Sequence, residues 1–203
     1  MKTKLRWGLS LGWIPILLLL SGCLMNVFHT ASTLGSGHVA LTVGSGLFDI
    51  NLLSDSESVY CLTPQARLAV GLADGIDLGI QTGLLVPIEA GDVGFFGVTG
   101  DVKFALFDEP DLFALSLGLG GGFSLEVLGL DAFALVLFDS HLKFLPLFVV
   151  YQPHFALTEG FALIHHVAGG LKLRLSDRVR ILIQADINSL TYVSYGVAFE
   201  VAF

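Results

Sequence analysis

Three histidines in the second half of the sequence are the residues best suited to acid–base chemistry. His165 and His166 are adjacent, and His154 precedes them in a stretch expected to be a loop. Such a histidine needs a nucleophile or an acid beside it, and the candidates follow later in the chain: Asp186, Ser189 and Ser194. The sequence has no G-x-S-x-G elbow. We therefore assign no catalytic residue and keep an enzyme that uses the His165/His166 region as an alternative.

Charged side chains alternate with apolar ones along the chain, as Lys172 and Arg174 do with Leu171 and Leu173. A membrane barrel explains this parity, because one face of each strand meets lipid and the other faces a polar lumen. Nine charges are expected in the lumen: Arg67, Asp77, Asp101, Lys103, Lys172, Arg174, Arg180, Asp186 and Glu200. Five are positive and four negative, which predicts a filled interior held by salt bridges, since isolated charges there would be unfavourable. A narrow solute-selective pore is the alternative.

The composition agrees with a lipid environment. The chain has 203 residues, of which 54% are hydrophobic and 14% charged, with 24 glycines, a net charge of −8 and a mean hydropathy of +0.78. Soluble domains carry about 25% charged residues. Disorder is excluded because it requires low hydrophobicity, and nucleic-acid binding is disfavoured because it requires a basic surplus.

Alternation with a period of two predicts β-strands. It is clearest from Val193 to Phe203, where every second residue is apolar. Short turns and longer loops divide the chain into ten expected strands, although eight are possible, near residues 37–50, 60–72, 76–86, 95–107, 111–121, 131–139, 143–152, 162–175, 178–188 and 191–203. The fold class is therefore all-β, a transmembrane antiparallel up-and-down barrel, which must close because an open edge in hydrocarbon leaves backbone groups without partners.

Two of these strands are expected to face the lumen with small residues, namely Ala114, Ser116, Gly118, Gly120, Ala132 and Ala134. Small residues on one wall make room for long Arg and Lys side chains from the opposite wall. Alternatively, they leave an apolar slot for an acyl chain, as a lipid-modifying barrel would require.

The first residues carry an export signal. Lys2, Lys4 and Arg6 precede an apolar run that is too short to span a membrane. The following Leu20-Ser21-Gly22-Cys23 resembles the lipobox of bacterial lipoproteins. The resemblance implies cleavage before Cys23 and acylation of this residue. We therefore divide the chain into a signal peptide (1–22), a periplasmic tether (23–36) and a barrel (37–203), and Cys61 is left without a disulfide partner.

The C-terminal residues Tyr195, Phe199 and Phe203 resemble the assembly signal of bacterial outer-membrane β-barrel proteins, and no particular family within this class is identified. The resemblance implies recognition by the barrel-assembly machinery during biogenesis. We expect an outer-membrane lipoprotein, anchored in outer-membrane lipid by its N-terminus, with a structural or interaction role in the cell envelope and an envelope partner that the sequence does not identify. The alternatives are a lipid-modifying or proteolytic barrel enzyme and a narrow pore. No cofactor, metal site or nucleic-acid partner is expected.

The lipobox makes a direct prediction about Cys23. In a bacterial host the wild-type chain should incorporate radioactive palmitate, and Cys23→Ala should abolish the label because the acylated thiol is lost. Cys61→Ala is the matched control and should label like the wild type. Equal labelling of Cys23→Ala and wild type would contradict the lipobox interpretation.

Overall fold

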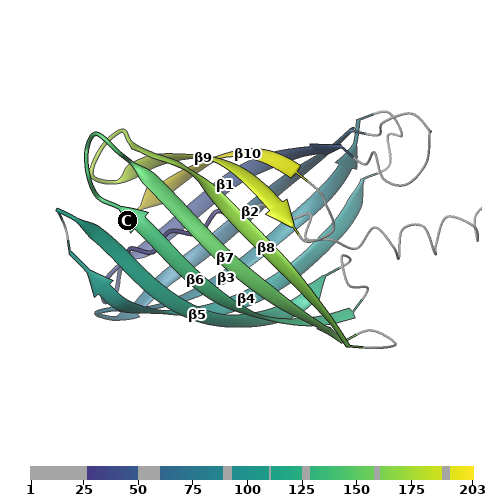
Figure 1. Ribbon diagram of the computed structural model, residues 1–203, viewed down its shortest axis with the longest axis horizontal. Coiled ribbons are helices and arrows are strands. Elements are labelled where there is room, and N and C mark those ends of the chain that lie inside the picture. Colours follow the sequence, from purple (N-terminus) through teal and green to yellow (C-terminus); the bar gives the residue numbers. More distant parts are fainter. Residues whose placement is uncertain are drawn as a thin grey trace, which may run out of the picture.

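Ten segments with alternating side chains form ten strands in the computed structural model, and the strands surround a common axis (Figure 1). The structure describes residues 27–49, 60–88, 93–109, 111–124, 129–157, 161–188 and 193–203. The strands are β1 (Val39–Asp49), β2 (Tyr60–Ala73), β3 (Ile76–Pro87), β4 (Gly94–Asp108), β5 (Phe113–Ser124), β6 (Gly129–Ser140), β7 (Leu147–Leu157), β8 (Phe161–Arg174), β9 (Val179–Asn188) and β10 (Val193–Ala202).

The first and last strands pair and close the barrel. β1 runs antiparallel to β10 with Val43 opposite Phe199, and every other strand pairs with its neighbours in sequence. Closure removes the sheet edges, so the backbone groups of the ladder bond within the protein and need neither water nor lipid. The predicted all-β, antiparallel up-and-down barrel is thereby confirmed, with ten strands rather than eight.

The strands alternate between an apolar outer face and a largely polar inner face. In β10 the side chains of Tyr195, Val197 and Phe199 point outward and are about half exposed, whereas Ala198 and Glu200 are buried inside. Exposed leucine, isoleucine, valine and phenylalanine side chains continue this outer belt on the other nine strands. The belt is the arrangement of a transmembrane barrel.

The two ends of the barrel differ in their connections. We call turn side the end at which β1 begins, β10 ends and the chain turns through Asp74 and Gly75. The opposite end, which holds the connection from β1 to β2, is called the loop side. Gly75 has φ 80°, a left-handed conformation that suits a glycine in this tight turn.

One predicted strand is displaced along the chain. The sequence predicts it at 143–152, whereas β7 spans Leu147–Leu157 and includes Pro153 opposite His165. The predicted loop position of His154 is therefore wrong, since His154 is a strand residue buried inside the barrel.

The side-chain direction predicted for the sixth strand is also wrong. Ala132 and Ala134 do not face the lumen, because β6 points Phe133, Leu135 and Leu137 inward instead. These larger side chains occupy the space beside the glycines of β5. A Cβ atom added to Gly120 would lie 2.3 Å from Cζ of Phe133. The proposed acyl slot is thus filled by the protein itself.

The expected periplasmic tether differs from the structure over residues 27–36. Val27, Phe28 and Ala31 are at most 5% exposed and belong to the same buried cluster as inward-facing strand residues. This part of the chain lies inside the barrel, where apolar side chains from both sources leave water together. Residues 23–26 lie outside the described residues, as does the proposed signal peptide.

No helix within the described ranges is long and apolar enough to cross a membrane.

The outer belt predicts a depth-dependent penalty for charge. Val197→Lys places an ammonium group near the middle of β10 and should lower the free energy of unfolding by about 2–4 kcal/mol in lipid vesicles. Val193→Lys, at the end of the same strand and on the same face, should lower it by about 0–1 kcal/mol. Urea unfolding followed by far-UV circular dichroism measures both. Equal small effects would contradict a lipid-facing surface.

Candidate functional site

The lumen is the candidate functional site, and residues 27–38 lie in it as a chain segment that we call the N-terminal segment. Its end nearest β1 lies at the turn side, where Gly37 and His38 form backbone hydrogen bonds with Gly71 of β2. A Cβ atom added to Gly71 would lie 1.8 Å from the carbonyl oxygen of Gly35, so only glycine permits this approach. The other end reaches the middle of the barrel, because Phe28 lies beside Gly44, halfway along β1.

Four aspartates accept hydrogen bonds from the backbone of the segment. The N–H of Leu34 donates to both carboxylate oxygens of Asp77 at 3.1 and 3.3 Å. Three more N–H groups donate in the same way over 3.3 to 3.4 Å, from Ser32 to Asp139, from Thr33 to Asp108 and from Ser36 to Asp74. A carboxylate is a strong acceptor for a backbone N–H. The aspartates come from different strands and turns and together surround the segment at the turn side.

Two side chains donate to the carbonyl groups of the same segment. Nζ of Lys103 donates to the carbonyl oxygens of Thr30 at 2.9 Å and of Ser32 at 2.7 Å. The hydroxyl of Ser116 donates to the carbonyl oxygen of Ala31. Buried backbone groups that lack partners are strongly unfavourable, and here the lumen provides partners for a chain that joins no sheet.

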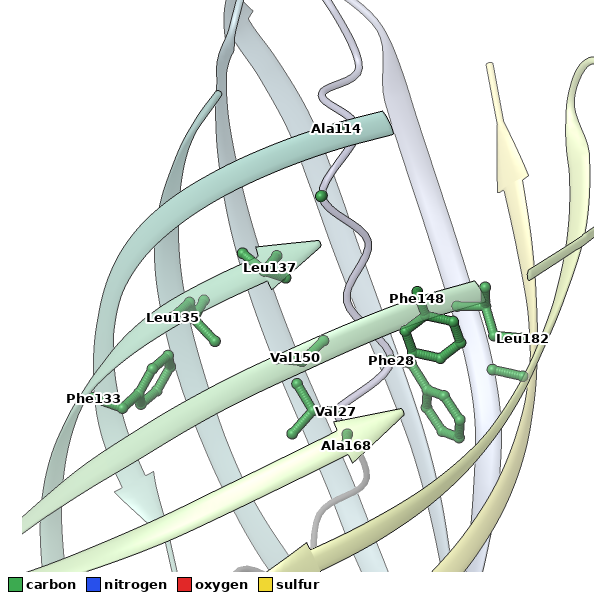
Figure 2. Packing of buried hydrophobic residues seen from close by; sticks show 12 residues of the cluster. Val27, Phe28, Ala114, Phe133, Leu135, Leu137, Phe148, Val150, Ala168 and Leu182 are labelled. Carbon is green, nitrogen blue, oxygen red and sulfur yellow. The ribbon is translucent and has the colours of Figure 1, made fainter. Parts of the chain in front are cut away.

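The inner end of the segment is apolar. Val27 and Phe28 pack in a buried cluster with large side chains from three strands, among them Phe148, Val150 and Leu182. Figure 2 shows Phe28 next to Phe148 and Val27 next to Val150. Full burial of such side chains contributes about 1.5–3 kcal/mol each. This contact explains why β6 and β7 direct apolar residues into a lumen that is otherwise polar.

His29 separates the apolar end from the polar contacts. Its Nε2 donates to Oε1 of Gln81 at 3.2 Å. Burial, together with the nearby positive charge of Arg67, lowers the pKa of His29 to about 3. The ring is therefore neutral and adds no charge to the lumen.

The predicted lumen charges are arranged mostly in pairs. Arg67 contacts Asp101 at 2.7 Å, Lys103 contacts Asp77 at 3.0 Å and Arg180 contacts Glu200 at 3.0 Å, and Lys172 contacts Asp139. The first two pairs are buried, with side chains at most 9% exposed. Lys103 and Asp77 thus bind each other as well as the N-terminal segment, which joins the salt bridges and the segment into one network.

One predicted lumen residue lies elsewhere. The side chain of Arg174 is 66% exposed and contacts Asp177 in the turn that follows β8. Arg174 has the expected parity, but it is the last residue of β8 and lies at the turn side. Residue parity alone does not reveal how far along the axis a strand remains inside the barrel.

The two adjacent histidines point to opposite faces. Nδ1 of His165 lies 2.7 Å from the Tyr151 hydroxyl in an exposed pair, whereas His166 is 1% exposed with Nε2 3.2 Å from Asp186. The hydroxyl of Ser194 donates to Asp186 at 3.2 Å. The aspartate thus lies between serine and histidine, and this order differs from a catalytic triad, in which the histidine is the central residue.

A row of polar side chains crosses five strands in the loop-side half of the lumen. It begins at Asp131 of β6, which lies 2.5 Å from Nδ1 of His154. The ring of His154 lies 6.4 Å from that of His166, measured between centroids. The row then continues through Asp186 to Ser194. Asp131 begins the predicted strand 131–139, whereas His154 was expected in a loop, and the displacement of β7 brings the two side chains together.

Sequence reasoning missed the importance of several residues in this site. Asp108 directly follows the predicted strand 95–107 and Asp139 ends the predicted strand 131–139, and nothing in their local pattern shows that they bind a distant segment. The signal that existed was the run Val27-Phe28, which is apolar and would be unfavourable in an aqueous tether.

The remaining candidate residues are placed as follows. Cys61 is a free and fully buried thiol that faces inward from β2. In the part of the chain that the structure describes, no three His, Cys, Asp or Glu residues form a group that could hold a metal ion. Tyr195, Phe199 and Phe203 are exposed on the outer surface at β10 and its end. Cys23 and Ser189 lie outside the described residues.

The chain matches no protein-family model and no curated protein sequence. Solved structures with a similar barrel include the N-terminal β-barrel domain of Pseudomonas aeruginosa OprF, with 11% identity, 83% of this chain and 99% of that chain covered and a TM-score of 0.39. Neisserial surface protein A has 10% identity, coverage of 82% and 96% and a TM-score of 0.40. The Acinetobacter baumannii outer membrane protein Omp33 has 9% identity, coverage of 84% and 100% and a TM-score of 0.41.

The network of salt bridges and segment contacts predicts unequal effects for two variants, one at a lysine and one at an arginine. Lys103→Met leaves Asp77 buried without its cation and two segment carbonyls without a donor, so the free energy of unfolding should fall by about 3–5 kcal/mol. Arg174→Met removes an exposed pair and should change it by no more than about 1 kcal/mol. Urea unfolding in detergent micelles measures both. The pairing would be structurally unimportant if the two variants behaved alike.

Proposed function

We propose that this chain is a bacterial outer-membrane barrel protein whose lumen is closed by its own N-terminal segment. Its role is structural or interactive in the cell envelope, and it does not serve as a permanently open pore. Three features support the membrane assignment, namely the closed ladder, the apolar outer belt and the polar interior. By the general rule for such barrels, the turn side faces the periplasm and the loop side faces the exterior.

The segment inside the lumen is the observation that carries the closed state. It combines buried apolar side chains with hydrogen bonds to aspartates of the turn side and to Lys103 of β4. Solute would have to displace all of these contacts to pass. The ion pairs of the lumen reinforce closure, because opposite charges that bind each other are not available to attract and conduct ions.

The proposal includes the lipid anchor at Cys23. Three residues lie between Cys23 and Val27, so the two Cα atoms are at most about 14 Å apart. Val27 precedes Phe28, which lies at the middle of the barrel. A lipid on Cys23 would therefore be attached close to the end of the segment that is bound in the lumen.

Contact with other envelope components is the interaction role that we propose. The outer belt contacts outer-membrane lipid, and the exposed aromatic residues of β10 serve recognition by the barrel-assembly machinery. The polar row with His166 is assigned no catalytic step, since Ser194 bonds to the aspartate rather than to the imidazole.

Conductance across planar lipid bilayers tests the closed lumen. The intact protein should show no steady open state. Phe28→Asp places a carboxylate in the apolar cluster, which should drive the segment out of the lumen and produce stepwise conductance.

His38→Asp is the matched control, because His38 belongs to the same segment but is exposed at the turn side. It should stay closed. Steady conductance of the unmodified protein would refute the proposed function and favour a pore. A closed Phe28→Asp variant that has retained its fold would show that the segment is not what closes the lumen.

A further inference from the structure

The N-terminal segment is held in a manner that resembles a bound ligand more than a part of the barrel. It contributes no strand to the sheet, and its described backbone bonds to the barrel wall are formed by Gly37 and His38 with Gly71. From Val27 to Leu34 the backbone bonds instead to side chains of the wall, such as those of Asp77, Asp139 and Lys103. This portion can therefore leave without breaking any ladder hydrogen bond of the barrel.

The side chains of the barrel wall bind mainly the backbone of the N-terminal segment. Asp77, Asp108 and Asp139 accept from three successive N–H groups, and Lys103 and Ser116 donate to three successive carbonyls. Every peptide main chain carries these groups, and the segment presents them from a backbone that bends at Ala31 and Ser32. The hydroxyl of Ser32 adds side-chain hydrogen bonds with Asp139 and His141.

The apolar end of the N-terminal segment determines which of its residues meet which contacts of the wall. Val27 and Phe28 belong to the same buried cluster as Phe148, Val150 and Leu182, at the opposite end of the segment from the N–H groups that the aspartates bind. A peptide shifted by one residue would place polar groups in the cluster, which is unfavourable. The wall therefore selects a peptide with an adjacent apolar pair about four residues before the first aspartate-bound N–H.

The wall also depends on having an occupant. Without one, the carboxylate of Asp77 loses two contacts from Leu34 and the ammonium group of Lys103 loses two carbonyl partners. With the segment in place, both side chains are buried and these contacts help to offset the cost of burying their charges. The interior of this barrel is thus preorganised for a peptide in a way that an empty or water-filled channel would not require.

We propose that the lumen is a peptide-binding site, specific for a main chain with an apolar pair, and that the N-terminal segment occupies it as a tethered ligand that a free peptide of the same pattern can replace. The inference rests on the proposed closed lumen and adds the chemical class of its ligand. Replacement is weak in the intact protein, because a short tether holds the segment at an effective concentration on the order of millimolar.

The test uses the purified full chain in detergent micelles and a fluorescent peptide with the sequence of residues 27–36, VFHTASTLGS. A specific protease site is inserted between Ser36 and Gly37, which are both exposed. After cleavage the peptide should exchange into the lumen and its anisotropy should rise to saturation. The uncleaved protein should bind it at least about a hundredfold more weakly, as the tether argument requires.

Variants of the peptide test which of its groups the wall recognises. Leu34→Pro removes the N–H that donates to Asp77 and should weaken binding about tenfold or more, whereas the matched Leu34→Ala keeps the N–H and should change affinity less than about threefold. Phe28→Asp in the peptide should abolish saturable binding. In the protein, Lys103→Met should weaken binding and Arg174→Met should not.

A second arm avoids cleavage. In the intact Phe28→Asp protein the tethered ligand is weakened, so the wild-type peptide should bind and suppress any conductance of this variant. The inference is overturned if neither the cleaved protein nor the Phe28→Asp protein binds the peptide. It is also overturned if a scrambled peptide binds equally, or if Leu34→Ala is as harmful as Leu34→Pro. Conductance of the uncleaved wild type reports separately on the proposed function.

Discussion

Backbone hydrogen bonding is the constraint on which the rest of this structure depends. A chain surrounded by hydrocarbon has to provide a partner for each N–H and C=O from within itself. The strands meet this demand by pairing β1 with β10 and closing the ladder. The N-terminal segment lies in the interior without a neighbouring strand for most of its length, and its backbone is satisfied by side chains such as Asp77 and Lys103.

The bonding of the N-terminal segment by side chains explains the composition of the lumen. Its charges do not only neutralise one another, because members of the salt bridges also bind the segment; Asp139, for example, contacts Lys172 and accepts from Ser32. Its apolar wall has the same origin, since Val27 and Phe28 need apolar neighbours in the barrel interior. Charge pairing, apolar packing and main-chain recognition are therefore three parts of one arrangement around the segment.

The two halves of the lumen differ for this reason. The turn-side half is organised around the segment and its aspartates, whereas the loop-side half carries the polar row from Asp131 to Ser194. In that row each histidine is oriented by an aspartate on a neighbouring strand, which fixes the rings inside the barrel. The outward His165 belongs to a different surface, although it is adjacent to His166 in sequence.

The sequence by itself determined the barrel. Alternation along Val193–Phe203 and similar segments specifies strands with two unlike faces, because successive side chains in a strand point in opposite directions. Parity therefore placed Arg67, Lys103 and Glu200 on the inner face correctly. Only the tertiary structure decided what fills the interior. Val27-Phe28 is apolar but too short to show an alternating pattern, and it packs with residues of β7 and β9 that lie more than a hundred positions later in the sequence. The same non-local packing reversed the expected parity of β6 and drew His154 into a strand, since a local pattern contains no information on which distant segment will cover it.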